Sequence, residues 1–475
     1  MVGDVSWGKA TVWSRANEES TMLVSIYECC DLGRIEKIAC GEVDVDESTD
    51  YTGRVDISGL LPDTCYKAYV AFETANINSL SCSWAVGDED KAKFTTAPPP
   101  SVAKQITFAW GGDVAGQNVC RDLNDGFPIF KAINTIEDLD FFVHAGDAIY
   151  ADNLCEVIGT AGNSQVEGLF NYSATLEDYN AHWKYILEDA SYQTLVSGQA
   201  FFMTWDDHEV VNDFGPDNDE RETPPYTAGE SLLPLGLEAF LNYNPIRNTV
   251  DTSDPTVFYR TVRWGKMMEM FILDTRQYRS LATLNDTEAN NKTMLGETQL
   301  AWLKDALTVS DATWKFIVSS VPISIPTGAS DLMRDGWANY NGQTGYESEL
   351  SEIFEFMANS GIDNVIFISA DVHFAEVFKY TPCALYPDWN VYEFVVGPMN
   401  AGLFPNTEFD KTFHPEVLFF YGPEDGNSFE ALYSWNETIP WFNFGKAEIA
   451  RNGTLKVSII NALNEVLYTL SLDPK

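Results

Sequence analysis

The sequence predicts an α/β protein, in which a layered domain of strands and helices follows a smaller all-β sandwich domain. Before residue 98, short segments of alternating apolar and polar residues are separated by turn residues, which is typical of β-sandwiches. After residue 98, apolar β-rich runs alternate with segments whose apolar residues recur every three to four positions, which is typical of layered α/β domains. A proline run separates the two patterns, so we expect domains at 1–98 and 99–475.

The first domain is expected to consist of short strands. These are KATVWSRA, TMLVSIYE, YTGRVDISGL, CYKAYVAFE and KAKFTT. The phrase GLLPDTCYKAYV at 59–70 resembles the turn-and-strand signature of fibronectin type III and immunoglobulin-like domains. The region contains no histidine and its carboxylates are scattered, so we assign it no catalytic role. The prolines at 98–100 are expected to insulate it from the second domain.

The second domain is expected to alternate strands and helices. Strands are predicted at ITFAWGGD, LDFFVHAGD, AFFMTWDDHE, MMEMFILDTR, WKFIVSSVP and NVIFISADVH, and helices at LEDYNAHWKYILED and LGETQLAWLKDAL. The tail LKVSIINALNEVLYTLSLDP predicts a β-hairpin that completes a sheet. In such domains the functional side chains collect at the carboxyl ends of the strands.

The chain is strongly acidic, with 71 acidic and 29 basic residues and a net charge of −42. This charge argues against nucleic acids and anionic membranes as partners. A phosphate substrate would need concentrated positive charge, which metal ions supply most compactly. No apolar run reaches the roughly 20 residues of a membrane span, and the N-terminus lacks the basic and apolar regions of a signal peptide.

The eight cysteines and five N-X-S/T sites fit a secreted, disulfide-bonded glycoprotein. No two cysteines have the CxxC spacing of a zinc or redox site. The acceptor residues are Asn171, Asn285, Asn291, Asn436 and Asn452. We expect a monomeric secreted, periplasmic or extracellular chain from which a signal peptide has been removed, although a chain that never carried one is also compatible.

Four of the expected strands end in side chains that can bind metals. These are Asp113; Asp147 and Tyr150; Asp206, Asp207, His208 and Glu209; and Asp371 and His373. Each cluster alone is weak evidence, because an aspartate at the end of a strand often caps the next helix. Together they predict a metal-binding rim, since the chain has only five histidines and two of them lie here. Of the others, His144 is expected in the core and His182 on the surface of a helix.

The chain resembles the alkaline phosphatase D (PhoD-type) family, a branch of the calcineurin-like metallophosphoesterases, from about residue 5 to its end. The blocks that carry the resemblance are FAWGGDVAGQ, HAGDAIYAD, TWDDHEVVND, LDTRQYR, RDGWANY, ISADVHFAEV and EFVVGPMNAG, in the order of the family. The resemblance implies a layered metallophosphoesterase β-sandwich flanked by helices and preceded by the β-rich module.

The resemblance also implies two metal sites. Asp147 matches a carboxylate that bridges both metals, and Tyr150 matches a tyrosinate that favours Fe³⁺. Asp113 and His373 would complete this first site. The second site would be rich in oxygen and suited to Ca²⁺ or another hard divalent cation such as Mg²⁺. Its expected ligands are Asp147, Asp207 and Asp371.

Three further residues are candidates for contact with the substrate. His208 matches a substrate-facing histidine of the wider superfamily, which would bind a phosphoryl oxygen or protonate the leaving alkoxide. A purely structural histidine is the alternative. Arg276 would clamp phosphate oxygens or else pair with a nearby acid, and both roles are open to Arg279. Asn212 is also expected within reach of the site.

Cys120 has two alternative roles. Some members of the family use a cysteine after the first strand as an iron ligand, and Cys120 has roughly that spacing. Loops that follow neighbouring strands emerge at the same edge of a sheet, so Cys120 and Cys155 can also approach within disulfide distance. We favour the disulfide.

The predicted reaction is hydrolysis of a phosphate ester by direct attack of a metal-bound hydroxide, because no Ser, Thr or Cys lies in a nucleophile motif. Small phosphomonoesters are the expected substrates. A phosphodiesterase with little monoesterase activity is the close alternative. A catalytically inactive, calcium-dependent surface-binding protein is the competing interpretation, although it leaves the tyrosine and histidines of the clusters without a purpose.

Overall fold

Three β-sheets form the frame of the protein, in a computed structural model that describes residues 1–29, 37–74, 90–216, 218–247, 250, 253–405, 408–423 and 433–475. The nine strands of the largest sheet lie in the order β20 (Val466–Leu472), β19 (Leu455–Asn461), β18 (Asn443–Ile449), β8 (Ile106–Gly111), β9 (Phe141–Ala145), β10 (Ala200–Thr204), β1 (Val2–Gly3), β2 (Lys9–Arg15) and β5 (Thr52–Ser58). The seven-stranded sheet has the order β11 (Arg260–Trp264), β12 (Met268–Ile272), β13 (Trp314–Val318), β14 (Val365–Ser369), β16 (Val391–Val395), β15 (Ala375–Tyr380) and β17 (Pro415–Tyr421). The four-stranded sheet consists of β4 (Lys37–Val45), β3 (Ser20–Glu28), β6 (Cys65–Glu73) and β7 (Asp90–Thr95).

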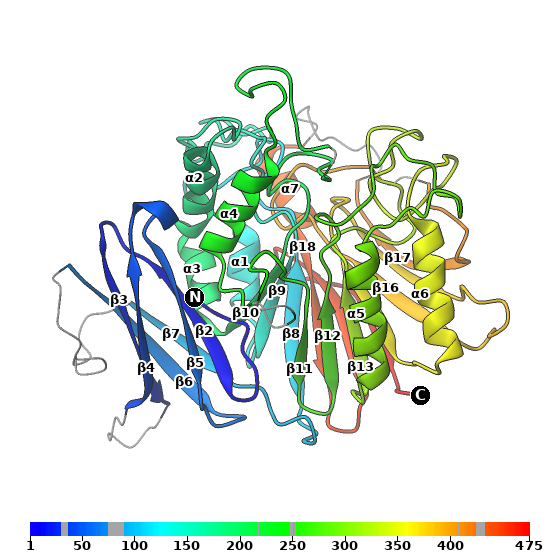
Figure 1. Ribbon diagram of the computed structural model, residues 1–475, viewed down its shortest axis with the longest axis horizontal. Coiled ribbons are helices and arrows are strands. Elements are labelled where there is room, and N and C mark those ends of the chain that lie inside the picture. Colours follow the sequence, from blue (N-terminus) through cyan, green and yellow to red (C-terminus); the bar gives the residue numbers. More distant parts are fainter. Residues whose placement is uncertain are drawn as a thin grey trace.

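Helices cover the outer faces of the two larger sheets (Figure 1). The nine-stranded sheet carries α1 (Pro128–Ile133), α2 (Leu176–Leu187), α3 (Ala190–Gly198) and α4 (Leu233–Tyr243). The seven-stranded sheet carries α5 (Gly296–Val309) and α6 (Glu347–Asn359). The short elements are α7 (Trp435–Thr438), η1 (Glu47–Thr49) and η2 (Ile439–Trp441). In the described part of the chain, we find no helix with the length and apolar character that crossing a membrane requires.

Alternation along the strands produces the layers. On β9, Phe141 and Val143 join the core between the sheets, whereas Phe142 packs beneath the helices of the nine-stranded sheet. On β14, Ile366 faces the shared core and Phe367 faces the helices of the other sheet. The fold is therefore a mixed α/β fold that is rich in sheet, as the sequence predicts.

The topology gathers the loops that follow several strands. β8, β9 and β10 are parallel neighbours, and so are β12, β13 and β14. Parallel neighbours end at the same edge of a sheet, so the polar residues that follow them lie close together. All of the strands and both helices expected after residue 98 are present, and the hairpin β19–β20 forms one edge of the nine-stranded sheet.

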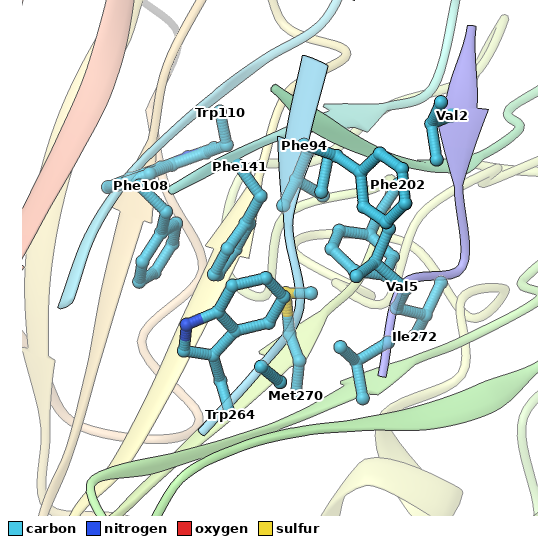
Figure 2. Packing of buried hydrophobic residues seen from close by; sticks show 14 of the residues in the cluster. Val2, Val5, Phe94, Phe108, Trp110, Phe141, Phe202, Trp264, Met270 and Ile272 are labelled. Atoms are coloured by element: carbon cyan, nitrogen blue, oxygen red, sulfur yellow. The ribbon is translucent and has the colours of Figure 1, made fainter. Parts of the chain in front are cut away.

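The N-terminal segment is not insulated from the rest of the protein, which corrects that expectation. β1 pairs in parallel with β10 through Gly3 and Phe201, so β1, β2 and β5 extend the largest sheet. Figure 2 shows Val2, Val5 and Phe94 in the same apolar cluster as residues of β10 and β12. The proline run therefore separates two patterns of sequence but not two cores.

A buried ion pair adds a polar tie between the two regions. The Arg260 guanidinium lies 2.8 Å from Asp4, and both side chains are almost fully buried. All five strands expected in the first 98 residues are present, together with β1 and β4, which were not expected. In the predicted turn-and-strand phrase, the backbone N–H of Leu61 donates to the Tyr66 hydroxyl at 2.8 Å. The assignment to the fibronectin type III or immunoglobulin-like class, and the boundary at residue 98, remain predictions.

His182 is an exception to the expected surface pattern of α2. Its side chain is buried and packs against the Phe170 ring at 3.7 Å between centroids. Its Nε2 lies 3.1 Å from the carbonyl oxygen of Asn171. The helix turns this histidine towards the loop that precedes it, and not towards solvent.

Candidate metal centre

The predicted ligands lie where backbone conformation is unusual. Asp113, Asp147, Asp371 and His373 have φ angles of 65°, 52°, 74° and 59°. Few residues other than glycine adopt this left-handed region, and those that do need support from their surroundings. At each of these positions the chain turns sharply just after a buried strand, which brings the side chains to one edge of the two sheets.

The first predicted site brings a tyrosine, a histidine and a carboxylate together. The Tyr150 hydroxyl lies 2.7 Å from His373 Nε2, and that nitrogen lies 3.8 Å from Asp113 Oδ1. His373 Nδ1 hydrogen-bonds the carbonyl oxygen of Gly402, which directs Nε2 towards the other two residues. Three residues from three separate loops thus converge as the resemblance implies.

The second predicted site is a group of carboxylates. Ligand atoms of Asp147, Asp206, Asp207 and Asp371 all lie within 4.8 Å of one another. Two overlapping groups with the same spacing extend the acidic region. They are Asp147, Asp207 and His208, and Asp207, Asp213 and Asp335. The structure therefore brings the three predicted ligands together and adds Asp206, which lies in one of the predicted clusters but was assigned to neither site.

Several carboxylate oxygens in this region have no hydrogen-bond partner among the described residues. They are Asp113 Oδ2, Asp206 Oδ2, Asp207 Oδ1 and Asp371 Oδ2, and all are buried. Burial raises the pKa of Asp113, Asp147 and Asp371 well above the ordinary value, and neighbouring carboxylates raise it further. Buried oxygens without partners are costly unless a cation binds them, so the residues present fit hard metal ions.

Glu209 connects the loops that carry these ligands. Its carboxylate accepts hydrogen bonds from the backbone N–H groups of Asp147, Ala148 and Asp206 at 3.2, 2.6 and 2.8 Å. The loop after β9 is thereby fixed to the loop after β10. The TWDDHE block contained this residue, but nothing local distinguished a ligand from a carboxylate that supports other ligands.

His208 is held by a carboxylate that was not predicted. Its Nδ1 donates to Asp152 at 2.6 Å, and the backbone N–H of Asn212 donates to the other oxygen of Asp152 at 2.9 Å. Burial alone would lower the pKa of His208, but Asp152 and Asp207 outweigh it and raise that pKa to about 10. Its ring packs on Tyr150 with centroids 4.1 Å apart. Asp152 ends the HAGDAIYAD block, which was the only signal for it.

Arg276 takes the second of its two predicted roles, pairing with acids. Its side chain is 0% exposed. Its Nε lies 2.6 Å from Asp206 and its Nη1 lies 2.7 Å from Asp335, while Asp207 is 3.4 Å away. Arg279 also pairs with Asp335, at 2.6 Å. The expected phosphate clamp is thus not supported, because this buried guanidinium already pairs with carboxylates.

A cavity of about 340 Å³ opens beside the carboxylates. Its lining includes Asp147, Asp207, His208, Asp371 and His373, and Asn212 lies at its exposed rim. Its lining also includes apolar residues, namely Ile325, Pro326, Phe374, Phe404 and Pro405. Asn212 is thus within reach of the cavity, but its role remains a prediction.

His144 is buried in the core, as expected.

Cys120 and Cys155 are joined in a disulfide, with Cα atoms 5.8 Å apart. This is the pairing favoured from the sequence, and it leaves Cys120 without the free thiolate that an iron ligand requires. A second disulfide joins Cys29 to Cys65. Cys30 and Cys82 lie outside the described residues.

The geometry agrees with comparisons to known proteins. A family model described as PhoD-like phosphatase matches residues 108–449. Alkaline phosphatase D of Bacillus subtilis (strain 168) is 28% identical over 346 residues, which are 69% of this chain and 54% of that protein. The chain thus spans about half the length of this curated relative.

Two solved structures share the fold over almost the whole chain. A structure of PhoD has a TM-score of 0.72 at 18% identity, and the match covers 99% of this chain and 88% of that chain. The purple acid phosphatase PPD1 from yellow lupin seeds has a TM-score of 0.60 at 14% identity and covers 99% of this chain and 73% of its own. At these identities the likeness concerns the fold.

Proposed function

Because the chain belongs to the PhoD-like phosphatase family, we propose that it is a metal-dependent phosphohydrolase that acts on small phosphate esters. The observation that carries this proposal is the group of buried carboxylate oxygens without partners beside an open cavity. Such a group lowers the stability of the folded protein when no cation is bound. It is suited to cations that bind a phosphoryl group.

We assign Fe³⁺ to a first site and Ca²⁺ or another hard divalent cation to a second, with Asp147 between them. Asp113, Tyr150 and His373 would complete the first site, and Asp207 and Asp371 the second. When bound, these ions would supply Lewis-acid chemistry, since they polarise phosphoryl oxygens and acidify the attacking water. The buried oxygens of Asp113 and Asp371 that lack a hydrogen-bond partner support this assignment.

The chain's own groups would orient the ester and handle the proton. Asp152 occupies Nδ1 of His208, which leaves Nε2 for the substrate. We expect Nε2 to donate to a phosphoryl oxygen or to the leaving alkoxide. Asn212 at the rim would add a hydrogen bond to phosphate. Arg276 would act indirectly, because it holds Asp206 and Asp335 in place.

Phosphomonoesters are the proposed substrates, and phosphodiesters are the close alternative. A secreted or periplasmic location is also proposed, because disulfides such as Cys120–Cys155 persist in oxidising compartments. The test is hydrolysis of p-nitrophenyl phosphate and bis-p-nitrophenyl phosphate by the full chain, before and after chelation, with metal analysis of the same sample. Activity on either ester that disappears with the metals supports the proposal.

The matched variants are Asp147→Asn and Asp305→Asn. Asp147 is buried at the proposed bridge, and Asp305 is exposed on α5. Asp147→Asn should lose at least about 10³-fold in kcat, since both ions depend on it, whereas Asp305→Asn should match the wild type. A protein that binds calcium but hydrolyses neither ester would instead be the surface-binding protein.

A further inference from the structure

The cavity beside the proposed metals is lined by two chemically different sets of residues. One set consists of the carboxylates and His208, and the other consists of apolar side chains. Phe404 belongs to the apolar set and adjoins the proposed ligands, because its ring stacks on His373 with centroids 4.3 Å apart and planes 19° from parallel. Phe404 is half-buried and Pro405 is exposed, so both are available to a molecule that enters the cavity. Pro326 lines the cavity from a different loop, and Ile325 beside it is buried.

The cavity has further carboxylates beyond the proposed ligands. Asp213 and Asp335 also line it, and its described lining residues include no lysine or arginine. Arg279 lies close by but pairs with Asp335 at 2.6 Å. Two further cationic groups lie near the cavity: His208, which is assigned above to the first phosphoryl group, and Arg221, whose Nη2 donates to the carbonyl oxygen of Asn212 at the rim. A second anionic group that lies beside Asp213, inside the cavity, would meet a carboxylate. The proposed metals account for one phosphoryl group, and the rest of the cavity disfavours negative charge.

On the premise of the phosphohydrolase activity above, we propose that this site selects phosphate esters whose alcohol is uncharged and apolar. The phosphoryl group would be held where the metals bind, and the alcohol would lie against Phe404, Pro405 and Pro326. Each methylene that is removed from water against these residues raises kcat/KM by up to about fourfold. The gain is expected to end once the chain extends beyond the apolar residues of the lining.

The test measures kcat/KM of the metal-loaded full chain for straight-chain alkyl phosphates from methyl to hexyl. Their alcohols have nearly the same acidity, so the chemical step is constant while apolar area increases. The expected result is a rise in kcat/KM with chain length followed by a plateau. Glycerol phosphate is similar in size to butyl phosphate but has a polar alcohol. Its kcat/KM should therefore not exceed that of methyl phosphate. Butane-1,4-diol bisphosphate should be at least about tenfold poorer than butyl phosphate, because its second phosphate meets Asp213.

Variants test the contributions of the apolar residues and of Asp213 separately. Phe404→Ala should flatten the dependence on chain length, and Phe404→Leu should restore most of it. Asp213→Asn should raise kcat/KM for the bisphosphate relative to that for butyl phosphate. Misfolding lowers both values and cannot produce this relative increase. Leu385→Ala is the control, since this leucine is 87% exposed and does not line the cavity.

The outcomes separate this inference from the proposed function. A protein that hydrolyses methyl and hexyl phosphate equally well, or that prefers the bisphosphate, overturns the inference and leaves the phosphohydrolase assignment intact. A dependence on chain length that Phe404→Ala does not change also overturns it. Failure to hydrolyse any of these esters, p-nitrophenyl phosphate included, contradicts the proposed function itself.

Discussion

Replacing Arg276 with leucine is expected to destabilise the protein without removing a contact to the substrate. The guanidinium is 0% exposed and lies 2.6 Å from Asp206 and 2.7 Å from Asp335. Leucine would remove this cation from beside Asp206, and in metal-free protein the loss of one partner of a buried ion pair typically costs about 3 to 5 kcal/mol. Arg279 still pairs with Asp335, so the lower half of this range is expected.

The size of the protein determines how this loss appears in a melting experiment. With an unfolding entropy of about 2 cal/mol/K per residue, a chain of 475 residues that unfolds as one unit loses about 1 °C for each kcal/mol. Arg276→Leu should therefore melt about 3 to 4 °C below the wild type. The assay is thermal unfolding of metal-loaded and metal-free protein. The KM for p-nitrophenyl phosphate should change little.

A surface pair supplies the matched control. Lys131 and Asp125 lie 3.2 Å apart with side chains 50% and 57% exposed, so Lys131→Met should shift the melting temperature by less than about 1 °C. The reasoning is refuted if Arg276→Leu melts like this control while its KM rises about tenfold or more. Arg276 would then bind phosphate after all.

Three other experiments test the disulfide, the histidine and the iron site. Cys155→Ser should cost about 3 to 4 kcal/mol, since the bridge closes a separation of 35 residues, and should keep its metals by elemental analysis; loss of iron would instead favour Cys120 as a ligand. Asp152→Ala should release His208 and lower kcat by about 10²-fold, more for alkyl than for p-nitrophenyl phosphate. An equal loss for both esters would argue against proton donation to the leaving group. Tyr150→Phe should abolish a visible charge-transfer band, and an active wild type that contains no iron would contradict the ferric assignment.

Local patterns predicted many of the strands and most of the candidate ligands, but they missed β1, β4, β11, β15, β16, β17 and β18. Each of Asp113, Asp147 and Asp371 directly follows or nearly follows a buried strand, and the buried run of β residues marks that strand in the sequence. Parallel strands end at a common edge, so residues far apart in the chain can be assigned to one rim before any contact is known. The periodicity of α2 was equally clear, but it did not show that His182 faces a neighbouring loop.

The sequence by itself indicated many of the strands, the candidate ligands that follow them and the acidic charge, because these depend on short stretches of the chain or on composition alone. Only the tertiary structure decided which partners the charged groups have. Arg276 meets Asp206 across 70 residues, His208 meets Asp152 across 56, and Arg260 meets Asp4 across 256. The same packing joined the N-terminal strands to the main sheet. Burial and the distance between charges set the strength of an ion pair, and both arise only when the two sheets pack together.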